Sequence, residues 1–134
     1  MPPVAPVLVD GSNVVMWLKN AGMETGARLD TLVSVLDQLA DEGKPARVIF
    51  DATIGYNLEG RFLHAGDLRR RLRRPGVSVT VVPKGTTADA ALIDEAVTTG
   101  SPIVTNDRYR DHPRHTQVRL RQGRFVAGQF RVMG

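Results

Sequence analysis

The stretch Pro102–His112 reads Pro-Ile-Val-Thr-Asn-Asp-Arg-Tyr-Arg-Asp-His and passes directly from a short apolar run into a dense group of polar side chains. Two other segments end in the same way: Val7–Val9 runs into Asp10, and Val48–Phe50 runs into Asp51. Open α/β sheets place their functional sites at the carboxyl ends of parallel strands. The three stretches therefore predict a parallel sheet that gathers aspartates at one edge.

Apolar runs and apolar residues at helical spacing alternate along the chain. The expected strands are 7–9, 46–50, 77–82 and 103–104, the expected helices are 29–40, 62–72 and 88–97, and the tail over 118–132 is expected to add one or two strands. This alternation is typical of a parallel sheet with helices on both faces. At 134 residues, we expect an α/β fold built as one domain over residues 1–134.

Two local features are assigned from turn and capping residues. Residues 52–60 carry Gly55 and Asn57 and are expected to form a loop. In the segment Thr-Thr-Ala-Asp, Thr86 is expected to cap the last helix, with Asp89 as its third residue. The first turn of that helix also lies at the carboxyl edge of the sheet, so Asp89 is both a capping residue and a candidate for chemistry.

Most candidates for chemistry are aspartates, and each has a simpler structural explanation. Asp10 before glycine is often only a turn former or a helix cap, although Asn13 follows at a spacing that lets both side chains face one cleft. Asp107 could cap a short helix, and Asp111 could pair with a neighbouring arginine. Asp89 is the fifth candidate.

A second tier consists of Asp51 and Asp94. Asp51 is the least specific of the strand-end acids. Asp94 follows Asp89 by five residues, which places it about 140° around the helix, so we expect a supporting or surface position. Tyr109, inside the polar stretch, is equally compatible with a place in the core.

The basic residues predict contact with a polyanion. The chain carries 18 Lys and Arg against 14 Asp and Glu, and residues 112–134 contain no acidic residue. Guanidinium groups suit phosphate, and basic patches attract nucleic acid, although a solvated helix face is the alternative for the cluster at 69–74. The predicted contacts with such a ligand are Arg69, Arg70, Arg73, Arg108, Arg110 and Arg114.

Composition excludes several classes of site. There is no cysteine, which rules out disulfides and thiolate zinc sites and agrees with a reducing cytoplasm. The apolar runs are too short to cross a bilayer, and no signal sequence is recognised. We therefore expect a cytoplasmic protein that is not associated with a membrane.

Clustered aspartates predict a metal ion. Two carboxylates about 4 Å apart repel each other by roughly 4 kcal/mol at an effective dielectric constant near 20. Oxygen ligands without cysteine or paired histidine favour a hard cation, Mg²⁺ or Mn²⁺. Such an ion beside arginines suits hydrolysis of a phosphodiester bond.

Four segments then carry a family resemblance. They are Val-Asp-Gly-Ser-Asn-Val at 9–14, Lys-Gly-Thr-Thr-Ala-Asp at 84–89, Val-Thr-Asn-Asp-Arg-Tyr-Arg-Asp at 104–111 and Arg-Phe-Val-Ala-Gly-Gln-Phe at 124–130. Together they resemble the NYN branch of the PIN-like nucleases, most closely the ribonuclease domain of the Regnase type, the zinc-finger CCCH ribonucleases. The likeness extends from about Pro6 to Val132.

The resemblance implies a three-layer α/β/α PIN-like domain and a Mg²⁺-dependent endoribonuclease. By position, Asp10, Asp89 and Asp107 correspond to the metal-site acids, with Asn13 and Asp111 in support. Two features depart from the family: the chain has no Cys/His zinc finger, and Ala88 precedes Asp89 where the relatives have paired aspartates.

The predicted function is cleavage of single-stranded or loop RNA by a metal-activated water. Two alternatives stay open: a toxin-type PIN-like nuclease, and a catalytically weak RNA-binding or assembly module that keeps the fold. RNA is the expected partner. A homodimer and a protein antitoxin or regulator are further partners that the sequence leaves open.

Overall fold

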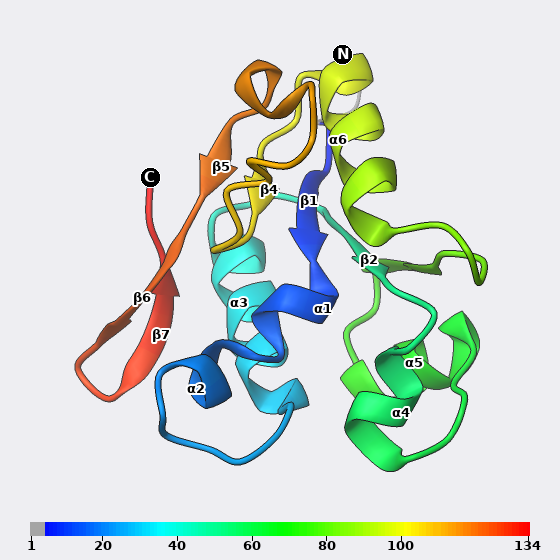
Figure 1. Ribbon diagram of the computed structural model, residues 1–134. Helices are drawn as coiled ribbons and strands as arrows, with labels where there is room; N and C mark the ends of the chain where they lie inside the picture. Colours follow the sequence, from blue (N-terminus) through cyan, green and yellow to red (C-terminus); the bar gives the residue numbers. More distant parts are fainter. Residues whose placement is uncertain (1–4) are drawn as a thin grey trace.

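The computed structural model describes residues 5–134, and a five-stranded sheet runs through its centre (Figure 1). The strands lie in the order β3-β2-β1-β4-β5, and every neighbouring pair is parallel. Their bounds are β1 Val7–Asp10, β2 Ala46–Phe50, β3 Ser78–Val81, β4 Ile103–Val104 and β5 Leu120–Arg121. This sheet and its flanking helices confirm the predicted α/β fold, which is consistent with a PIN-like α/β/α arrangement.

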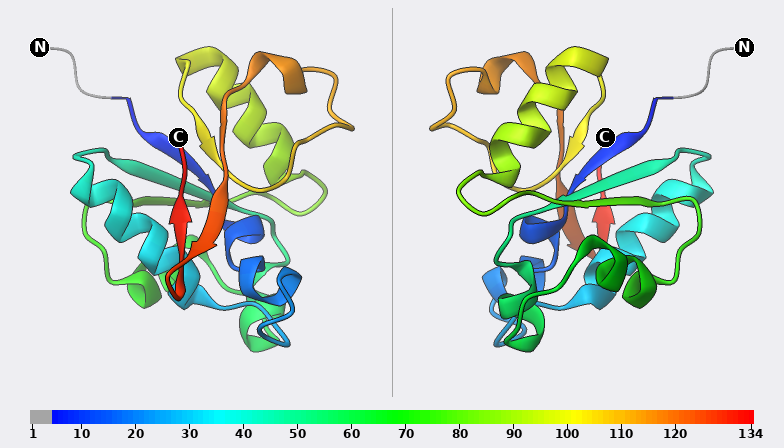
Figure 2. Two further views of the ribbon diagram at one scale, coloured as in Figure 1. Left: turned by 90° about the vertical axis from the view of Figure 1, so that its left-hand side faces the viewer. Right: turned by 90° about the vertical axis from the view of Figure 1, so that its right-hand side faces the viewer.

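Both faces of the sheet are covered, because successive side chains of a strand point to opposite sides. Val7 and Val9 of β1 pack into one core with α3 and α5, whereas Leu8 packs into a second core with α6. These helices are α3 Leu29–Asp41, α5 Ala65–Leu72 and α6 Ala88–Thr99. Figure 2 shows α6 on one side of the sheet and α3 and α5 on the other.

The carboxyl ends of the central strands lie side by side, because β1 pairs in parallel with both β2 and β4. The short helices α1 Gly11–Val14 and α2 Trp17–Asn20 follow β1 at this edge. Gly11 has no room for a side chain, since a Cβ atom there would lie 2.4 Å from Cε1 of Phe50. Glycine is therefore required where the chain leaves β1.

The expected loop over residues 52–60 is wrong, because this segment contains the helix α4, Ile54–Glu59. Ile54 is fully buried, and a Cβ atom on Gly55 would lie 2.3 Å from the carbonyl oxygen of Arg61. Close packing of the helix against the following backbone thus outweighs the low helix propensity of glycine and asparagine. The helix ends at Gly60, which has a φ of 71°.

The start of the next helix also differs from the prediction. Helix α5 begins at Ala65, three residues later than expected, because His64 caps it. The backbone N–H of His64 donates to the carboxylate of Asp67 at 3.0 Å, which completes a capping box. Leu63 lies before the helix but is buried in the same core. Its place in the apolar pattern is therefore explained by burial, and it does not indicate that the helix extends to residue 63.

Thr87, and not Thr86 as expected, caps α6. Its hydroxyl accepts the backbone N–H of Ala90 at 3.2 Å, while the hydroxyl of Thr86 donates to the carbonyl of Pro83 at 2.7 Å. Asp89 is consequently the second helical residue and not the third. The shift does not move Asp89 away from the carboxyl edge, because the helix still begins there.

The tail forms one more strand than the two expected. Besides β5, it contains an antiparallel hairpin of β6 Gly123–Val126 and β7 Gln129–Val132, which makes a separate two-stranded sheet. A short 3-10 helix, His115–Gln117, precedes β5. No helix within residues 5–134 has the length and apolar character needed to cross a bilayer.

Candidate active site

Asp10 ends β1 and is buried, with 3% of its surface exposed. One carboxylate oxygen accepts the backbone N–H of Asn13 at 3.2 Å, so Asp10 caps α1. The other oxygen accepts the hydroxyl of Thr105 at 3.1 Å and the phenol of Tyr109 at 2.7 Å. The carboxylate therefore joins the end of β1 to the loop that follows β4.

The pKa of Asp10 is raised to about 6, mainly by burial and to a smaller extent by the charge of Asp89, against the hydrogen bonds from Tyr109, Asn13 and Thr105, which lower it. Tyr109 is itself buried, and its pKa is raised mainly by burial and next by the charge of Asp10. The phenol therefore keeps its proton and donates a hydrogen bond to Asp10. Tyr109 is both a core residue and part of the site.

Asn13 positions the loop that follows β4. Its side-chain oxygen accepts the indole N–H of Trp17 at 2.7 Å and the backbone N–H of Asn106 at 2.8 Å. Asn106 in turn exchanges hydrogen bonds with the backbone of Gly123, at the start of β6. The amide side chains thus hold α1, the loop after β4 and the hairpin together.

Asp51 connects the end of β2 to the start of α6. Its backbone N–H donates to the hydroxyl of Ser12 at 2.8 Å, and its carboxylate accepts the backbone N–H of Ala88 at 2.8 Å. An anion at the N-terminus of a helix is favourable, because the unpaired N–H groups and the helix dipole both attract it. Asp51 thus has a structural role and also adds negative charge to the edge.

Three predicted residues, Asp89, Asp107 and Asp111, line one cavity of about 180 Å³ at this edge. Asp107 also organises its own loop: its carboxylate accepts the backbone N–H of Tyr109 at 2.8 Å, and its N–H donates to the hydroxyl of Thr105 at 3.1 Å. Tyr109 lines the cavity too, so Asp10 lies directly behind the wall of the cavity. The structure therefore brings four of the predicted aspartates to one edge of the sheet: Asp10, Asp51 and Asp107, which end or follow strands, and Asp89, which begins α6.

Like charges act on one another at this edge. The pKa of Asp89 is raised by burial first and then by the charges of Asp107 and Asp51, and only His112 lowers it. Within residues 5–134, none of these three aspartates forms an ion pair with lysine or arginine. Within this part of the chain, the negative charge of these three aspartates is thus not neutralised by a salt bridge.

Asp94 lies elsewhere. Its carboxylate pairs with the guanidinium of Arg114 at 3.0 Å on an exposed part of α6. Asp94 therefore lies at the surface, one of the two positions expected for it. Arg114, a predicted RNA contact, has Asp94 as its ion-pair partner. Arg110 lines the acidic cavity, whereas Arg108 lines a different one with Arg124.

Four residues of the site were not predicted as site residues: Ser12, Thr105, Asn106 and Tyr109. Each lies within three residues of a predicted aspartate, so proximity in sequence was the available signal. The hydrogen bonds that give them a role, however, join residues 39 to 99 positions apart, which no local pattern reveals.

The donor set suits an open site for a hard cation. Within residues 5–134, no three Asp, Glu or His side chains form a ready-made group for a metal ion. Mg²⁺ usually binds proteins through one or two carboxylates and completes its shell with water and substrate phosphate. Asp89 and Asp107 fit that description, while direct ligation by Asp10 stays a prediction because Thr105 and Tyr109 cover one of its oxygens.

Comparison with known proteins gives matches in structure only. No protein-family model matches the chain, and no curated protein matches its sequence. Among solved structures, the nuclear protein-only RNase P 2 (PRORP2) of Arabidopsis thaliana matches with a TM-score of 0.69 and 20% sequence identity, covering 100% of this chain and 30% of PRORP2.

Rae1 (YacP) of Bacillus subtilis matches with a TM-score of 0.57 and 20% identity, covering 89% of this chain and 69% of Rae1. At this identity the likeness establishes the fold, which agrees with the predicted PIN-like arrangement. The chain spans only 30% of the length of PRORP2, so it corresponds to one part of that protein.

Proposed function

We propose that the chain is a divalent-cation-dependent endoribonuclease that cuts single-stranded or loop RNA at the edge formed by Asp10, Asp89 and Asp107. The observation that carries this proposal is the group of aspartates at this edge: burial and neighbouring carboxylates raise the pKa of Asp10 and of Asp89, and none of the three acids pairs with an arginine or lysine within residues 5–134. Such a group costs stability, so folding alone does not account for it. Binding of a hard cation that in turn contacts a phosphate backbone would account for it.

Two independent resemblances support cleavage of RNA. PRORP2 is by its name an RNase P and shares the fold of this chain. The segments at 9–14, 84–89 and 104–111 resemble those of NYN-type nucleases, and these same segments supply the residues of the acidic edge. The closer likeness to the Regnase type, and the homodimer and the protein antitoxin considered above, remain predictions.

When bound, Mg²⁺ or Mn²⁺ would lower the pKa of a water molecule and neutralise charge that develops on the phosphate. Asp89 and Asp107 would hold the ion from the wall of the cavity, and Asp10 would add negative charge from behind. Asp111, which lines the same cavity, would orient water. Arg110, from the same loop, would contact a phosphate oxygen.

The remaining residues of the site would fix geometry. Tyr109 and Thr105 hold the carboxylate of Asp10, and Asn13 holds the backbone at Asn106. Tight positioning of this kind contributes strongly to catalysis, because a shift of about 1 Å in a reacting group can lower a rate about a hundredfold.

The test replaces Asp107 with asparagine. We expect Asp107→Asn to lower cleavage of a labelled single-stranded RNA in Mg²⁺ by at least about a hundredfold, a loss typical of removing one electrostatic contact to the transition state. RNA binding should be unchanged or tighter, because a negative charge is removed beside the phosphates. Addition of EDTA to the wild-type protein should abolish cleavage.

Asp94→Asn is the matched control, because it makes the same chemical change on the exposed side of α6, and it should cleave at the wild-type rate. Cleavage that persists in EDTA, or that is equal in Asp107→Asn and wild type, would contradict the proposal. Binding of RNA with no cleavage in any divalent cation would favour the RNA-binding module instead.

A further inference from the structure

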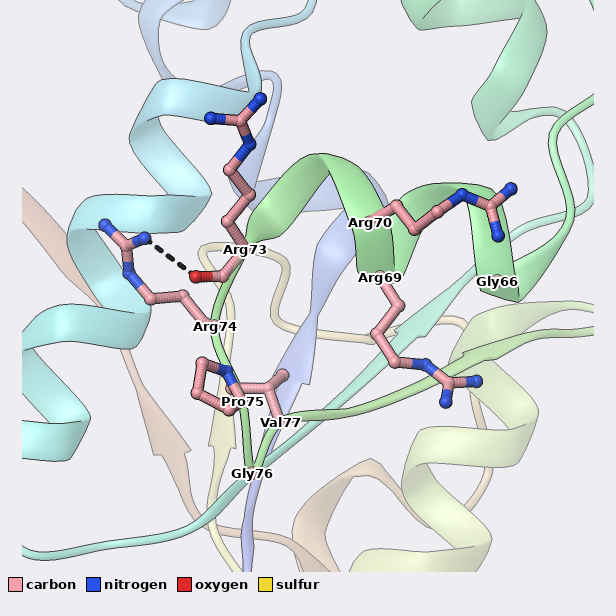
Figure 3. A pocket seen from close by; sticks show the side chains of 8 residues that line it. All are labelled: Gly66, Arg69, Arg70, Arg73, Arg74, Pro75, Gly76 and Val77. Carbon is pink, nitrogen blue, oxygen red and sulfur yellow. Dashed lines mark hydrogen bonds between the residues drawn. The ribbon is translucent and has the colours of Figure 1, made fainter.

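A second cavity, of about 500 Å³, lies beside the last turn of α5 and contains no carboxylate in its lining (Figure 3). Its polar lining consists of the side chains of four arginines: Arg69, Arg70, Arg73 and Arg74. In Figure 3, Arg69 and Arg70 project to one side of the helix and Arg73 and Arg74 to the other, with the segment Pro75–Val77 between them. The cavity is therefore a basic groove and not a closed pocket.

Two of the four guanidinium groups form an ion pair with a carboxylate, and the other two do not within residues 5–134. Arg70 pairs with Asp67, and Arg74 pairs with Asp37 on the neighbouring helix α3. Arg69 and Arg73 are exposed and form no ion pair with any residue of 5–134. The groove thus presents two free positive charges next to two partly neutralised ones.

Arg73 occupies a backbone conformation that favours glycine. It ends α5 with a φ of 52°, whereas the equivalent positions that end α4 and α6 are the glycines Gly60 and Gly100. A left-handed conformation is strained for a residue with a side chain. Positive charge near a helix C-terminus is favourable, but Arg69, Arg70 and Arg71 already supply it within the last turn. Stability alone therefore does not explain an arginine at position 73.

The groove and the acidic edge lie at opposite ends of the sheet, and the helices beside them, α5 and α6, cover opposite faces of it. Pro75–Val77 leads into the amino end of β3, while the aspartates lie at the carboxyl edge of the sheet. A strand of four residues spans about 13 Å. A stacked nucleic acid strand advances about 3.4 Å per nucleotide, so this length alone takes about four nucleotides. Because β2 lies between β3 and β1, the path to the aspartates is longer still.

We propose that this groove binds the sugar–phosphate backbone of a single-stranded RNA, more than four nucleotides from the bond that is cut. The identity of the ligand as RNA rests on the proposed function. Arginine is suited to this role because its planar guanidinium binds phosphate oxygens through two parallel hydrogen bonds. The lining contains no aromatic side chain on which a base could stack, so the contact is independent of sequence.

The first test measures binding without cleavage, in EDTA and with the Asp107→Asn variant as the parent protein. Binding of a 20-nucleotide RNA is followed by fluorescence anisotropy over a range of salt concentrations. Adding Arg69→Gln and Arg73→Gln should weaken binding and lower the slope of log K against log salt by about 1.4, which is about 0.7 for each lost phosphate contact on a single strand.

The matched control removes two positive charges on the other side of the sheet, through Arg119→Gln and Arg131→Gln. Arg119 precedes the opposite edge strand β5, and Arg131 lies in β7. The control should leave the slope within experimental error of the parent. An equal loss of slope in the control and in the groove variant would overturn the proposal, because the effect would then be one of net charge.

Arg73→Gly separates ligand binding from stability. If the side chain serves RNA, this variant should melt a few degrees higher, because glycine relieves the left-handed strain, and yet bind RNA more weakly. A purely structural side chain would change stability and leave RNA affinity unmoved, and that result would overturn the proposal.

Substrate length provides the third readout, in the active protein with Mg²⁺. A 20-nucleotide RNA should show a raised KM and an unchanged kcat in the Arg69→Gln/Arg73→Gln variant, whereas a four-nucleotide RNA should be cut equally by variant and wild type. Competition provides a further check. If poly-glutamate displaces the labelled RNA from the protein with the same potency as unlabelled RNA of equal charge, the proposal is overturned in favour of an acidic protein partner. Because binding is measured without cleavage, a failure of the nuclease proposal would not be mistaken for a failure of this one.

Discussion

Asp10 is a buried acid whose surroundings favour its neutral form. Its pKa in the folded protein is about 6, above the value of 3.8 for an unperturbed aspartate. The folded state therefore binds a proton more tightly than the unfolded state. As a result, the protein loses stability as pH rises from about 4 to about 6, and the full cost is present above that range. The cost is about 3 kcal/mol, since each pKa unit corresponds to about 1.36 kcal/mol.

Replacement of Asp10 by asparagine tests this account. Relative to wild type, Asp10→Asn should gain about 2–3 kcal/mol in free energy of unfolding between pH 4 and pH 7.5, because the amide does not ionise. Urea unfolding in EDTA at the two pH values measures the difference. A difference between variant and wild type that does not change with pH would show that Asp10 keeps an ordinary pKa.

The β6–β7 hairpin is an element held in place by polar contacts with α3. The side chain of Gln38 exchanges two hydrogen bonds of 2.8 Å with the backbone of Val132. Arg121 of β5, only 8% exposed, donates through Nε to the carbonyl of Met133, directly after β7, at 3.1 Å. Its guanidinium also donates to both carboxylate oxygens of Glu42, directly after α3, at 2.9 and 3.1 Å, and it holds the pKa of that carboxyl below its usual range. The hairpin in turn contacts the loop after β4 through the hydrogen bonds of Gly123 with Asn106.

Loss of the Glu42 carboxylate should therefore destabilise the protein. We expect Glu42→Gln to lower the free energy of unfolding by about 2 kcal/mol, because a buried guanidinium loses a charged partner. Glu24→Gln is the control: its pair with Arg28 is exposed, so its effect should stay within about 0.5 kcal/mol. Equal stability of Glu42→Gln and wild type by urea unfolding would show that the hairpin does not depend on this pair.

At the scale of the whole molecule, the fold separates negative from positive charge. Aspartates that form no ion pair with any residue of 5–134 lie at the carboxyl edge of the sheet, and the arginine groove lies at the amino end of β3. Self-repulsion at the acidic edge lowers stability, and a ligand that binds only the folded state restores it. The proposed ion should therefore act on the stability of the entire domain.

Manganese should raise the melting temperature of the wild-type protein. At a concentration a hundred times the dissociation constant, the gain is about 2.7 kcal/mol, which corresponds to several degrees for a domain of this size. The Asp89→Asn/Asp107→Asn variant should start from a higher melting temperature and show no such gain. Equal shifts in the variant and in wild type, followed by differential scanning fluorimetry, would place the binding of manganese elsewhere.

Much of the fold could be predicted because the local signals were strong. Strand β2 and strand β4 have their predicted bounds, and α3 lies where the apolar spacing placed it. Helix α4 was missed because the close approach of Gly55 to the backbone of Arg61 is a tertiary contact that reverses the local preference. The cap of α6 was misplaced by one residue because two adjacent threonines offer the same chemistry.

Asp10, Asp51 and Asp107 could be placed at one edge from the order of residues alone, because parallel strands joined by crossover helices bring their carboxyl ends to the same side of a sheet. The order of residues did not determine which of these acids would have a lysine or arginine partner. Asp94 is neutralised by Arg114 and Asp89 is not, and the phenol of Tyr109 reaches Asp10 across 99 positions of sequence. These outcomes depend on distances between side chains that are remote in the chain, and such distances are fixed only when the helices pack on the sheet.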